Sequence, residues 1–305
     1  MILWKLSSRL DRIDPYWYSR LIGLKAAYIA VGLFIANMIL KPAQPSLTML
    51  FSAAGICLIE MPTINDVDKK DNIYLGYVII MSLTLAIFAS TSFLKLSFVI
   101  VVALWAYVLY FALRRQPELF AIVSVLLMLA TIGQEGINVG NYFMIWDSIL
   151  FIAEFALISF WLHKLFPFMY HKIWLSSILR QLESISEIAD KRHVGSLSLK
   201  LRRHAIVSQS SINLLKKRNY APIAKQINQG VAGYHYYLYH ILNDYDVAYD
   251  FEVIANDFDA LAAAIQQQVP LLNYKLVSDE ELANHNTQFM NIVTQWNQLC
   301  VHVNN

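Results

Sequence analysis

The chain changes character once, near residue 167, and this change constrains its fold more than any motif does. Up to that point, apolar runs long enough to cross a bilayer follow one another with short interruptions, and beyond it the sequence is polar and charge-rich. A hydrocarbon core of roughly 30 Å requires about 20 mostly apolar residues per helical crossing. The hydrophobic content of 57% and the mean hydropathy of +0.44 agree with such crossings. We therefore predict a membrane domain followed by a soluble domain.

The predicted fold is all-α, with a bundle of six transmembrane helices followed by a cytoplasmic α-helical domain. The transmembrane domain is expected at residues 21–168 and the cytoplasmic domain at residues 169–305. Residues 1–20 alternate apolar and charged side chains at helical spacing, which is typical of a helix lying in the membrane interface. The six predicted spans are residues 21–40, 46–61, 73–93, 94–113, 117–134 and 145–166.

Lysine and arginine residues set the predicted orientation, because they are enriched in short cytoplasmic loops. One side of the predicted membrane domain carries most of them, whereas the other side has only Lys41 and Lys95. With an even number of spans, both termini then lie in the cytoplasm, and we expect the protein in a bacterial inner membrane. The basic residues predicted on the cytoplasmic side are Lys5, Arg9, Arg12, Arg20, Lys69, Lys70, Arg114, Arg115, Lys164, Lys172 and Arg180.

The tail is predicted to form four or five helices, because apolar residues recur at helical spacing and no strand-like alternation persists. The residues at this spacing are Ile173, Ile178, Leu182, Ile185 and Ile188, and again Phe251, Ile254, Phe258, Leu261 and Ile265. Residues 172–225 hold eleven Lys or Arg against three Asp or Glu, and residues 244–281 hold nine acidic residues against one basic residue. One interpretation is that the two halves pack antiparallel and compensate each other's charge. The other is that the basic half faces anionic lipid headgroups. The formal net charge of only +2 speaks against nucleic acid as a partner. The basic residues in question are Lys200, Arg202, Arg203, Lys216, Lys217 and Arg218.

The sequence contains no P-loop, GxSxG, HExxH or CxxC pattern. His235 and His240 are five residues apart, which places them on different faces of a helix and favours packing over metal binding. We therefore predict no enzymatic activity, no metal and no cofactor. The tail is expected to serve in oligomerisation or regulation.

Ionisable residues inside predicted spans are costly and are usually tied to function or to a partner. Glu154 lies near the middle of the last span, and Asp147 lies two turns earlier on the same face. This pair predicts either a route for protons or a structural role through buried hydrogen bonds. Lys25, Glu60 and His163, like Asp147, lie close enough to the ends of their spans to snorkel.

Three further polar residues are candidates for a transport site. Gln134 and Glu135 lie in a glycine-rich stretch, residues 131–140, where irregular backbone is tolerated if it lines a cavity. A flexible external loop is the alternative there. Asn37 lies in the first span, where we expect it at a contact between helices. As substrate-binding candidates we take Asn37 and Gln134, and as proton-coupling candidates Glu154, Asp147 and Glu135.

The first half also resembles a known family. Residues 16–20 (Tyr-Trp-Tyr-Ser-Arg) lead into a span that opens with Leu-Ile-Gly-Leu-Lys-Ala-Ala, Pro45 starts the second span, Pro62 ends it, and a lysine-containing loop precedes Gly76. This order resembles the membrane half of the fusaric-acid-resistance (FUSC) and aromatic acid exporter family over about residues 16–166. The segment before Gly76 departs from the family, whose third span usually opens with an Arg before a Gly-Thr segment. Many bacterial members also carry two copies of the membrane unit, whereas this chain has one.

The resemblance implies export of small aromatic or other organic carboxylates by an assembly of two or more chains. It assigns Lys25 the role of attracting the anion from the cytoplasm, which makes Lys25 a third substrate-binding candidate. We expect an inner-membrane exporter of small organic anions, coupled to protons, with membrane lipids and a second copy of the chain as partners. The alternatives are a gated organic-anion channel and a membrane scaffold whose tail recruits a partner. Transport predicts that Lys25→Ala and Glu154→Gln abolish flux, whereas a scaffold tolerates both.

Overall fold

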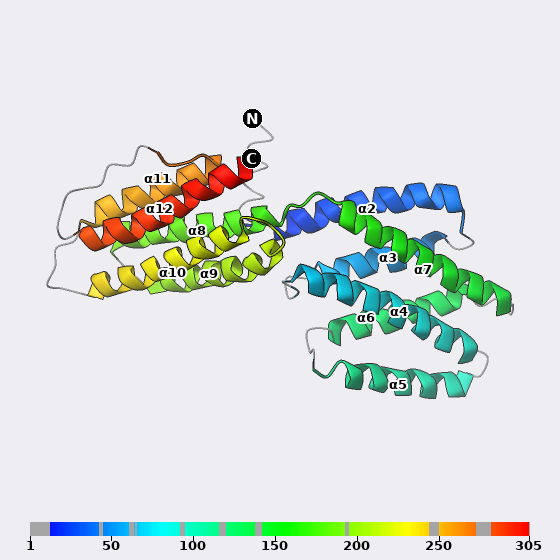
Figure 1. Ribbon diagram of the computed structural model, residues 1–305. Coiled ribbons are helices and arrows are strands. Elements are labelled where there is room, and N and C mark those ends of the chain that lie inside the picture. The colour runs from blue at the N-terminus through cyan, green and yellow to red at the C-terminus, as the bar shows by residue number, and fades with distance from the viewer. Residues whose placement is uncertain are drawn as a thin grey trace. The chain divides into compact units, whose positions relative to one another are not determined.

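The computed structural model describes residues 13–42, 45–60, 64, 66–91, 95–115, 120–137, 142–192, 195–243, 250–272 and 282–304. Over these residues every regular element is a helix, which confirms the all-α prediction (Figure 1). The chain divides into two compact units. One unit, here called the apolar unit, comprises Arg20–Pro167, and the other, the tail unit, combines Met1–Ser19 with Phe168–Asn305.

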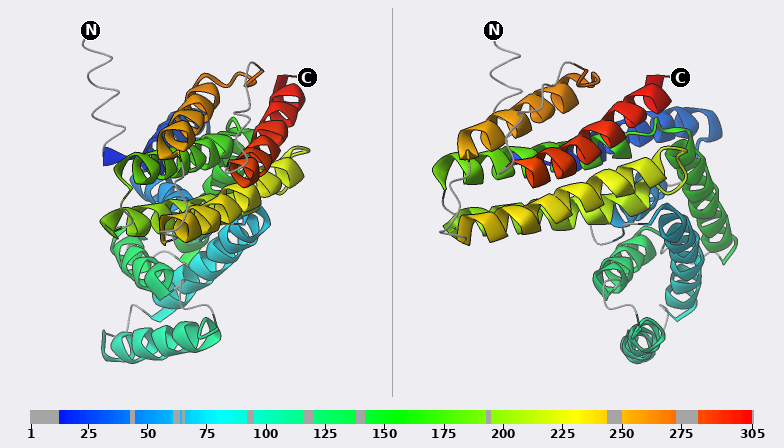
Figure 2. Two further views of the ribbon diagram at one scale, coloured as in Figure 1. Left: turned by 90° about the vertical axis from the view of Figure 1, so that its left-hand side faces the viewer. Right: turned by 60° about the vertical axis from the view of Figure 1, so that its left-hand side comes forward.

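Helix α4 lies at the centre of the apolar unit, because it contacts α3, α5, α6 and α7. Helix α5 contacts α4 and α6 and lies at an edge of the unit (Figures 1 and 2). These helices lie at the six predicted positions, with bounds that differ by a few residues. The bounds are α2 Tyr18–Leu40, α3 Pro45–Ile59, α4 Val67–Thr91, α5 Lys95–Ala112, α6 Phe120–Ile137 and α7 Tyr142–Leu165.

The number of helices that qualify as membrane spans is smaller than six. Two described helices, α2 and α4, are long and apolar enough to cross a membrane, and the number rises to three if the apolar part of α7 is taken with the helix that follows it. The difference has a simple cause, since α3 has 15 residues and α5 and α6 have 18 each. At about 1.5 Å per residue, helices of this length measure roughly 22–27 Å, less than a typical hydrocarbon core.

Tyrosine side chains and small residues hold α3, α4 and α7 together. The Tyr74 hydroxyl donates to the carbonyl of Ala156 at 2.8 Å and also lies 2.9 Å from Ser159 Oγ, and both of these residues belong to α7. The Tyr77 hydroxyl donates to the carbonyl of Phe51 on α3 at 3.1 Å. Gly55 lies against these two rings, because a Cβ placed there would come within 2.7 Å of Tyr77 Cε1. The polar ends of both tyrosines are therefore satisfied inside an apolar core.

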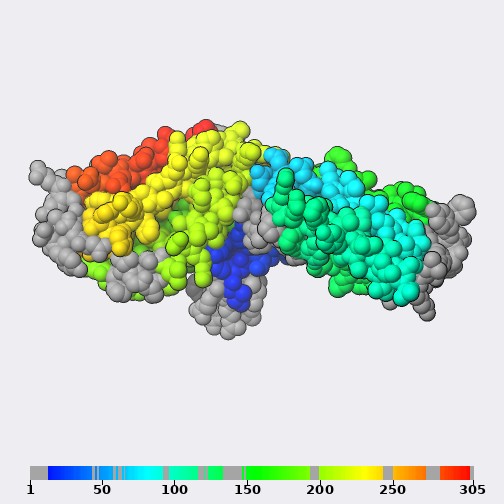
Figure 3. Space-filling view, turned by 90° about the horizontal axis from the view of Figure 1, so that it is seen from below, coloured from blue at the N-terminus to red at the C-terminus, as the bar shows by residue number. Residues whose placement is uncertain are grey.

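The surface of the apolar unit is rich in large apolar side chains. Helix α5 is the clearest case. Its residues, coloured between cyan and green, form part of the surface seen in Figure 3. An exposed apolar band of this kind suits lipid rather than water as the solvent. The exposed large apolar residues of α5 are Leu96, Val99, Ile100, Leu104, Tyr107, Val108 and Phe111.

The tail unit is built around α8, which packs against α9, α10 and α11, while α10 packs against α12. The apolar residues that predicted this helix are all buried on one face of α8, namely Ile173, Ile178, Leu182, Ile185 and Ile188. The same is true of α11, where Phe251, Phe258 and Ile265 are buried. The five helices lie side by side in two views (Figures 1 and 2). Their bounds are α8 Tyr170–Lys191, α9 Gly195–Leu215, α10 Ala221–Asn243, α11 Phe251–Gln267 and α12 Ala283–Asn304.

Buried polar side chains in the tail unit are hydrogen-bonded across helices. His285 on α12 is fully buried, with Nδ1 2.6 Å from the Tyr234 hydroxyl of α10 and Nε2 2.7 Å from Asp257 Oδ2 of α11. A second network joins α8, α9 and α10. In it, Asn228 Oδ1 of α10 accepts from the Trp174 indole of α8 at 2.9 Å and from Ser208 Oγ of α9 at 2.7 Å. These two networks tie all five helices into one core.

The chain segment just before α2 belongs to the tail unit. The Tyr16 hydroxyl lies 2.6 Å from His204 Nδ1 on α9, and Lys172 on α8 lies 4.4 Å from the centroid of the Trp17 ring. The tail unit therefore contains residues that precede the apolar unit in the chain as well as residues that follow it. Residues 1–12, which hold most of the predicted interfacial helix, lie outside the described residues.

Candidate functional site

A cluster of charged side chains is buried in the apolar unit, and we call it the charge cluster. Its centre is Glu60, which directly follows α3. Glu60 Oε1 lies 2.5 Å from Lys25 Nζ of α2, and Glu60 Oε2 lies 2.6 Å from Lys70 Nζ of α4. All three side chains are at most 4% exposed. One carboxylate thus joins three helices by bonding a different lysine with each of its oxygens.

The charge cluster continues onto α7. His163 Nδ1 lies 3.6 Å from Glu60 Oε1, and His163 Nε2 lies 3.7 Å from Asp71 Oδ1. Asp71 in turn pairs with Lys164, whose side chain is about one-third exposed. The cluster therefore runs from fully buried groups at Glu60 to a partly exposed end at Lys164.

Lysines outnumber carboxylates in these contacts. The contacts join three lysines to two carboxylates, and Lys164, the outermost lysine, is partly exposed. Buried lysine charges are costly unless they are paired, and an approaching anion or water lowers this cost. An electrostatic interaction is also strongest in a setting of low dielectric constant. The cluster can therefore attract a small anion to the end of an apolar helix bundle.

A cavity of about 350 Å³ lies between α4, α5 and α6 in the same unit. Its wall is mostly apolar, and Lys69 and Asn72 on the first turns of α4 add the polar groups. Gly76 faces open space, because a Cβ built there meets no other atom within 4 Å. Lys69 directly precedes Lys70 of the charge cluster, so the polar end of the cavity lies at the same end of α4 as the cluster.

The residues predicted from the sequence fall into three groups. Lys25 is in the charge cluster, although it is paired with Glu60 rather than placed at an interface. Asn37 is half-buried on α2, and its buried Oδ1 has no hydrogen-bond partner among the described residues. Asp147 and Glu154 are both exposed on α7, so the single chain does not bring them into the cluster.

The remaining two candidates, Gln134 and Glu135, lie in α6, which stays helical as far as Ile137. The backbone is therefore not irregular at these positions, and their side chains lie outside the described residues.

Five of the six cluster members were not predicted as site residues: Glu60, Lys70, Asp71, His163 and Lys164. Their predicted depth in the membrane is the feature of the sequence that could have identified Glu60 and Lys70. Lys25 lies about one turn into the first span, Glu60 ends the second, and Lys70 precedes the third, so all three lie at the same predicted membrane boundary. Opposite charges at one depth in neighbouring spans favour ion pairing.

No group of three or more His, Cys, Asp or Glu that could hold a metal ion occurs among the described residues. The chain was also compared with known proteins: no family model matches it, and neither the curated proteins nor the solved structures provide a match.

Proposed function

We propose that the chain is a multi-pass membrane protein that moves small organic anions out of the cytoplasm. In this proposal, all six helices of the apolar unit lie in the membrane and both termini lie in the cytoplasm of a bacterial cell. The observation that carries the proposal is the charge cluster, in which three lysines meet two carboxylates in an apolar helix bundle. The resemblance to the FUSC family suggests organic carboxylates as the class of substrate.

The anion's entry follows from the order of burial in the cluster. Lys164 is the most exposed of the three lysines and would meet the anion first, whereas Lys25 and Lys70 are buried around Glu60. The mostly apolar cavity between α4, α5 and α6 would hold the apolar part of the substrate. A carboxylate with an apolar body matches this combination of a charged end and an apolar wall.

Assembly of more than one chain follows from Asp147 and Glu154. Both lie on the outside of α7 in the single chain, and Glu154 is near the middle of the predicted span. A carboxylate facing hydrocarbon is too costly to be left uncovered. We propose that a second copy of the chain covers this face, and that the covered pair carries the protons that drive export.

The decisive experiment measures efflux from proteoliposomes loaded with a panel of aromatic carboxylates, with and without an uncoupler. Lys25→Met should abolish efflux, because the cluster loses one of its three lysine charges. Arg115→Gln is the matched control, since it removes an exposed positive charge beyond α5 and should leave efflux unchanged. Equal efflux from Lys25→Met and wild-type protein would contradict the proposal.

A second pair of variants tests the cavity without touching any charge. Gly76→Trp fills the cavity and should block efflux. Gly23→Trp, on α2, also places its side chain in open space but away from the cavity, so efflux should continue. If both variants transport equally well, the substrate does not use the cavity. Loss of proton dependence in Glu154→Gln, with efflux retained, separates an exporter from a channel.

A further inference from the structure

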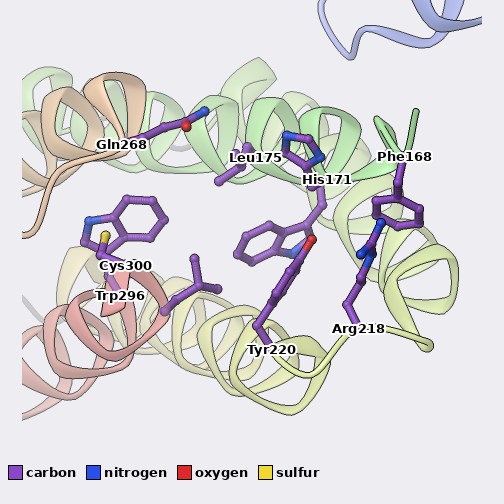
Figure 4. A pocket seen from close by; sticks show the side chains of 10 residues that line it. Phe168, His171, Leu175, Arg218, Tyr220, Gln268, Trp296 and Cys300 are labelled. Carbon is purple, nitrogen blue, oxygen red and sulfur yellow. The ribbon is translucent and has the colours of Figure 1, made fainter. Parts of the chain in front are cut away.

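A second cavity, of about 240 Å³, lies within the tail unit (Figure 4). It is enclosed by the start of α8, the turn between α9 and α10, the end of α11 and the middle of α12. Figure 4 shows Arg218, Phe168 and His171 toward one end and Trp296 and Cys300 at the other. The cavity is independent of the charge cluster, because all of its lining residues belong to the tail unit.

Aromatic side chains form much of the cavity wall. Trp174 is 1% exposed and its indole donates to Asn228, and Trp296 is 2% exposed and its indole donates to the carbonyl of Val269 at 2.9 Å. Both N–H groups are bonded within the protein and both rings are almost fully covered, so the small surface that the two indoles present to the cavity is apolar. Aromatic surfaces of this kind favour planar, apolar ligands through stacked or edge-to-face contact.

The opposite end of the cavity carries one positive charge. The Arg218 guanidinium stacks over Phe168 at 4.0 Å from the ring centroid, and no carboxylate among the described residues forms an ion pair with it. Burial, and secondarily the nearby Lys172 and Arg218, lowers the pKa of His171, so this ring is neutral at pH 7. Arg218 is thus the charge that a ligand would meet, and stacking on Phe168 restricts the orientation of its fork of N–H donors.

We propose that this cavity binds a small planar apolar molecule that carries one anionic group. The ring system packs against the largely aromatic wall of the cavity, and the anionic group accepts hydrogen bonds from Arg218. The volume suits one or two fused rings, because ligand cavities larger than about 300 Å³ generally hold bulkier molecules. The tail unit thereby gains a binding site of its own.

Calorimetry on the full-length protein in lipid nanodiscs tests this site, with empty nanodiscs as the blank. The probes are 2-naphthoate and its neutral counterpart 2-naphthamide. Naphthoate should bind about tenfold more tightly or better, as expected for hydrogen bonds to a charged group. Arg218→Gln should weaken naphthoate binding to the level of the amide, whereas Arg202→Gln, on the exposed face of α9, should not.

Variants that fill the cavity test whether naphthoate binds there. Leu175→Trp places a larger side chain in the cavity and should abolish naphthoate binding, and Leu199→Trp, which is exposed on α9, should leave it unchanged. Should Leu175→Trp fail to fold, the Arg218 comparison still decides, because that position is exposed. Equal affinity for naphthoate and naphthamide, or unchanged naphthoate binding in Arg218→Gln, would overturn the proposal. Neither result bears on efflux through the apolar unit, so the two proposals fail separately.

Discussion

The apolar unit and the tail unit distribute polarity in opposite ways. In the tail unit, isoleucine, leucine and aromatic side chains fill the core, and lysine, arginine and glutamate side chains cover much of the surface. In the apolar unit, most of the exposed residues are large and apolar, while the charges of Lys25, Glu60 and Lys70 are buried. The two units therefore expose opposite kinds of surface, although both are made only of helices where the structure describes them.

The difference also indicates which contacts determine the packing of the helices in each unit. Apolar contact gives little preference between helices when the surroundings are apolar as well, so buried polar contacts must select the packing of the apolar unit. In the tail unit water drives apolar side chains together, and the burial of Ile178, Leu182 and Ile185 already selects the inner face of α8. The same substitution should therefore have different consequences in the two units.

The largest difference is expected when one carboxylate is removed from each unit. Glu60→Ala leaves Lys25 and Lys70 buried without their shared partner and should lower the free energy of unfolding by about 3–5 kcal/mol. Glu183→Ala breaks only the exposed pair with Arg180 on α8 and should cost less than about 0.5 kcal/mol. Thermal unfolding in detergent measures both. Similar losses in the two variants would mean that the charge cluster is not buried in the folded protein.

Glycine-to-alanine substitutions should change stability in opposite directions. Gly55→Ala forces a Cβ against the rings of Tyr77 and Tyr74 and should destabilise the apolar unit by about 1–3 kcal/mol. Gly233→Ala on α10 meets no atom within 4 Å and should stabilise the tail unit by about 1 kcal/mol through helix propensity. Denaturant unfolding followed by circular dichroism reports each change. A stabilising Gly55→Ala would contradict the close packing of α3 on α4.

A smaller effect is expected at the start of α11. Asp250 is the N-cap of this helix, and its side chain accepts hydrogen bonds from the backbone N–H groups of Glu252 and Val253 at 3.2 and 3.3 Å. Asp250→Ala should cost about 1 kcal/mol, and Asp250→Ser should restore most of this loss. The comparison of the two variants by thermal unfolding isolates the cap from the loss of charge. Equal destabilisation by Ala and Ser would rule out the capping role.

The smallest effect is a pH dependence confined to the tail unit. Burial lowers the pKa of His204 to about 4, helped by the basic side chains of Arg180, Arg203 and Lys200. A histidine with a lowered pKa stabilises the fold fully above its unfolded pKa of about 6.5, and this stability is lost as the pH falls toward 4. Hydrogen exchange at residues 13–19, which dock through Tyr16, should therefore accelerate relative to the intrinsic rate between pH 6.5 and 4. The variant His204→Phe should show no such change, and a wild-type response identical to it would refute the prediction.

The sequence was sufficient for the helices but not for the contacts between them. Apolar spacing at Phe251, Phe258 and Ile265 correctly identified the buried face of α11, because a helix in water must have one apolar face. In α7 the residues are apolar on all sides, so the pattern contains no information about which face is inward. Glu154 could accordingly be placed near the middle of the predicted span, but no pattern indicated that it points away from the unit.

The charge cluster illustrates the same limit. Lys25, Glu60 and His163 each lie near the end of a predicted span, where a snorkelling side chain and a buried ion pair are equally consistent with the sequence. Only the packing of α2, α3, α4 and α7 decides between these outcomes. The pairing of both Lys25 and Lys70 with Glu60 is a property of that packing rather than of any local motif.

The contact between Tyr16 and His204 has a consequence for biosynthesis. Its two partners are 188 residues apart, and the whole apolar unit is made between them. At about 5–20 residues per second, a ribosome needs roughly 10–40 s to reach the second partner after the first. The N-terminal aromatic residues must therefore wait for their docking site on α9 while the whole apolar unit is synthesised.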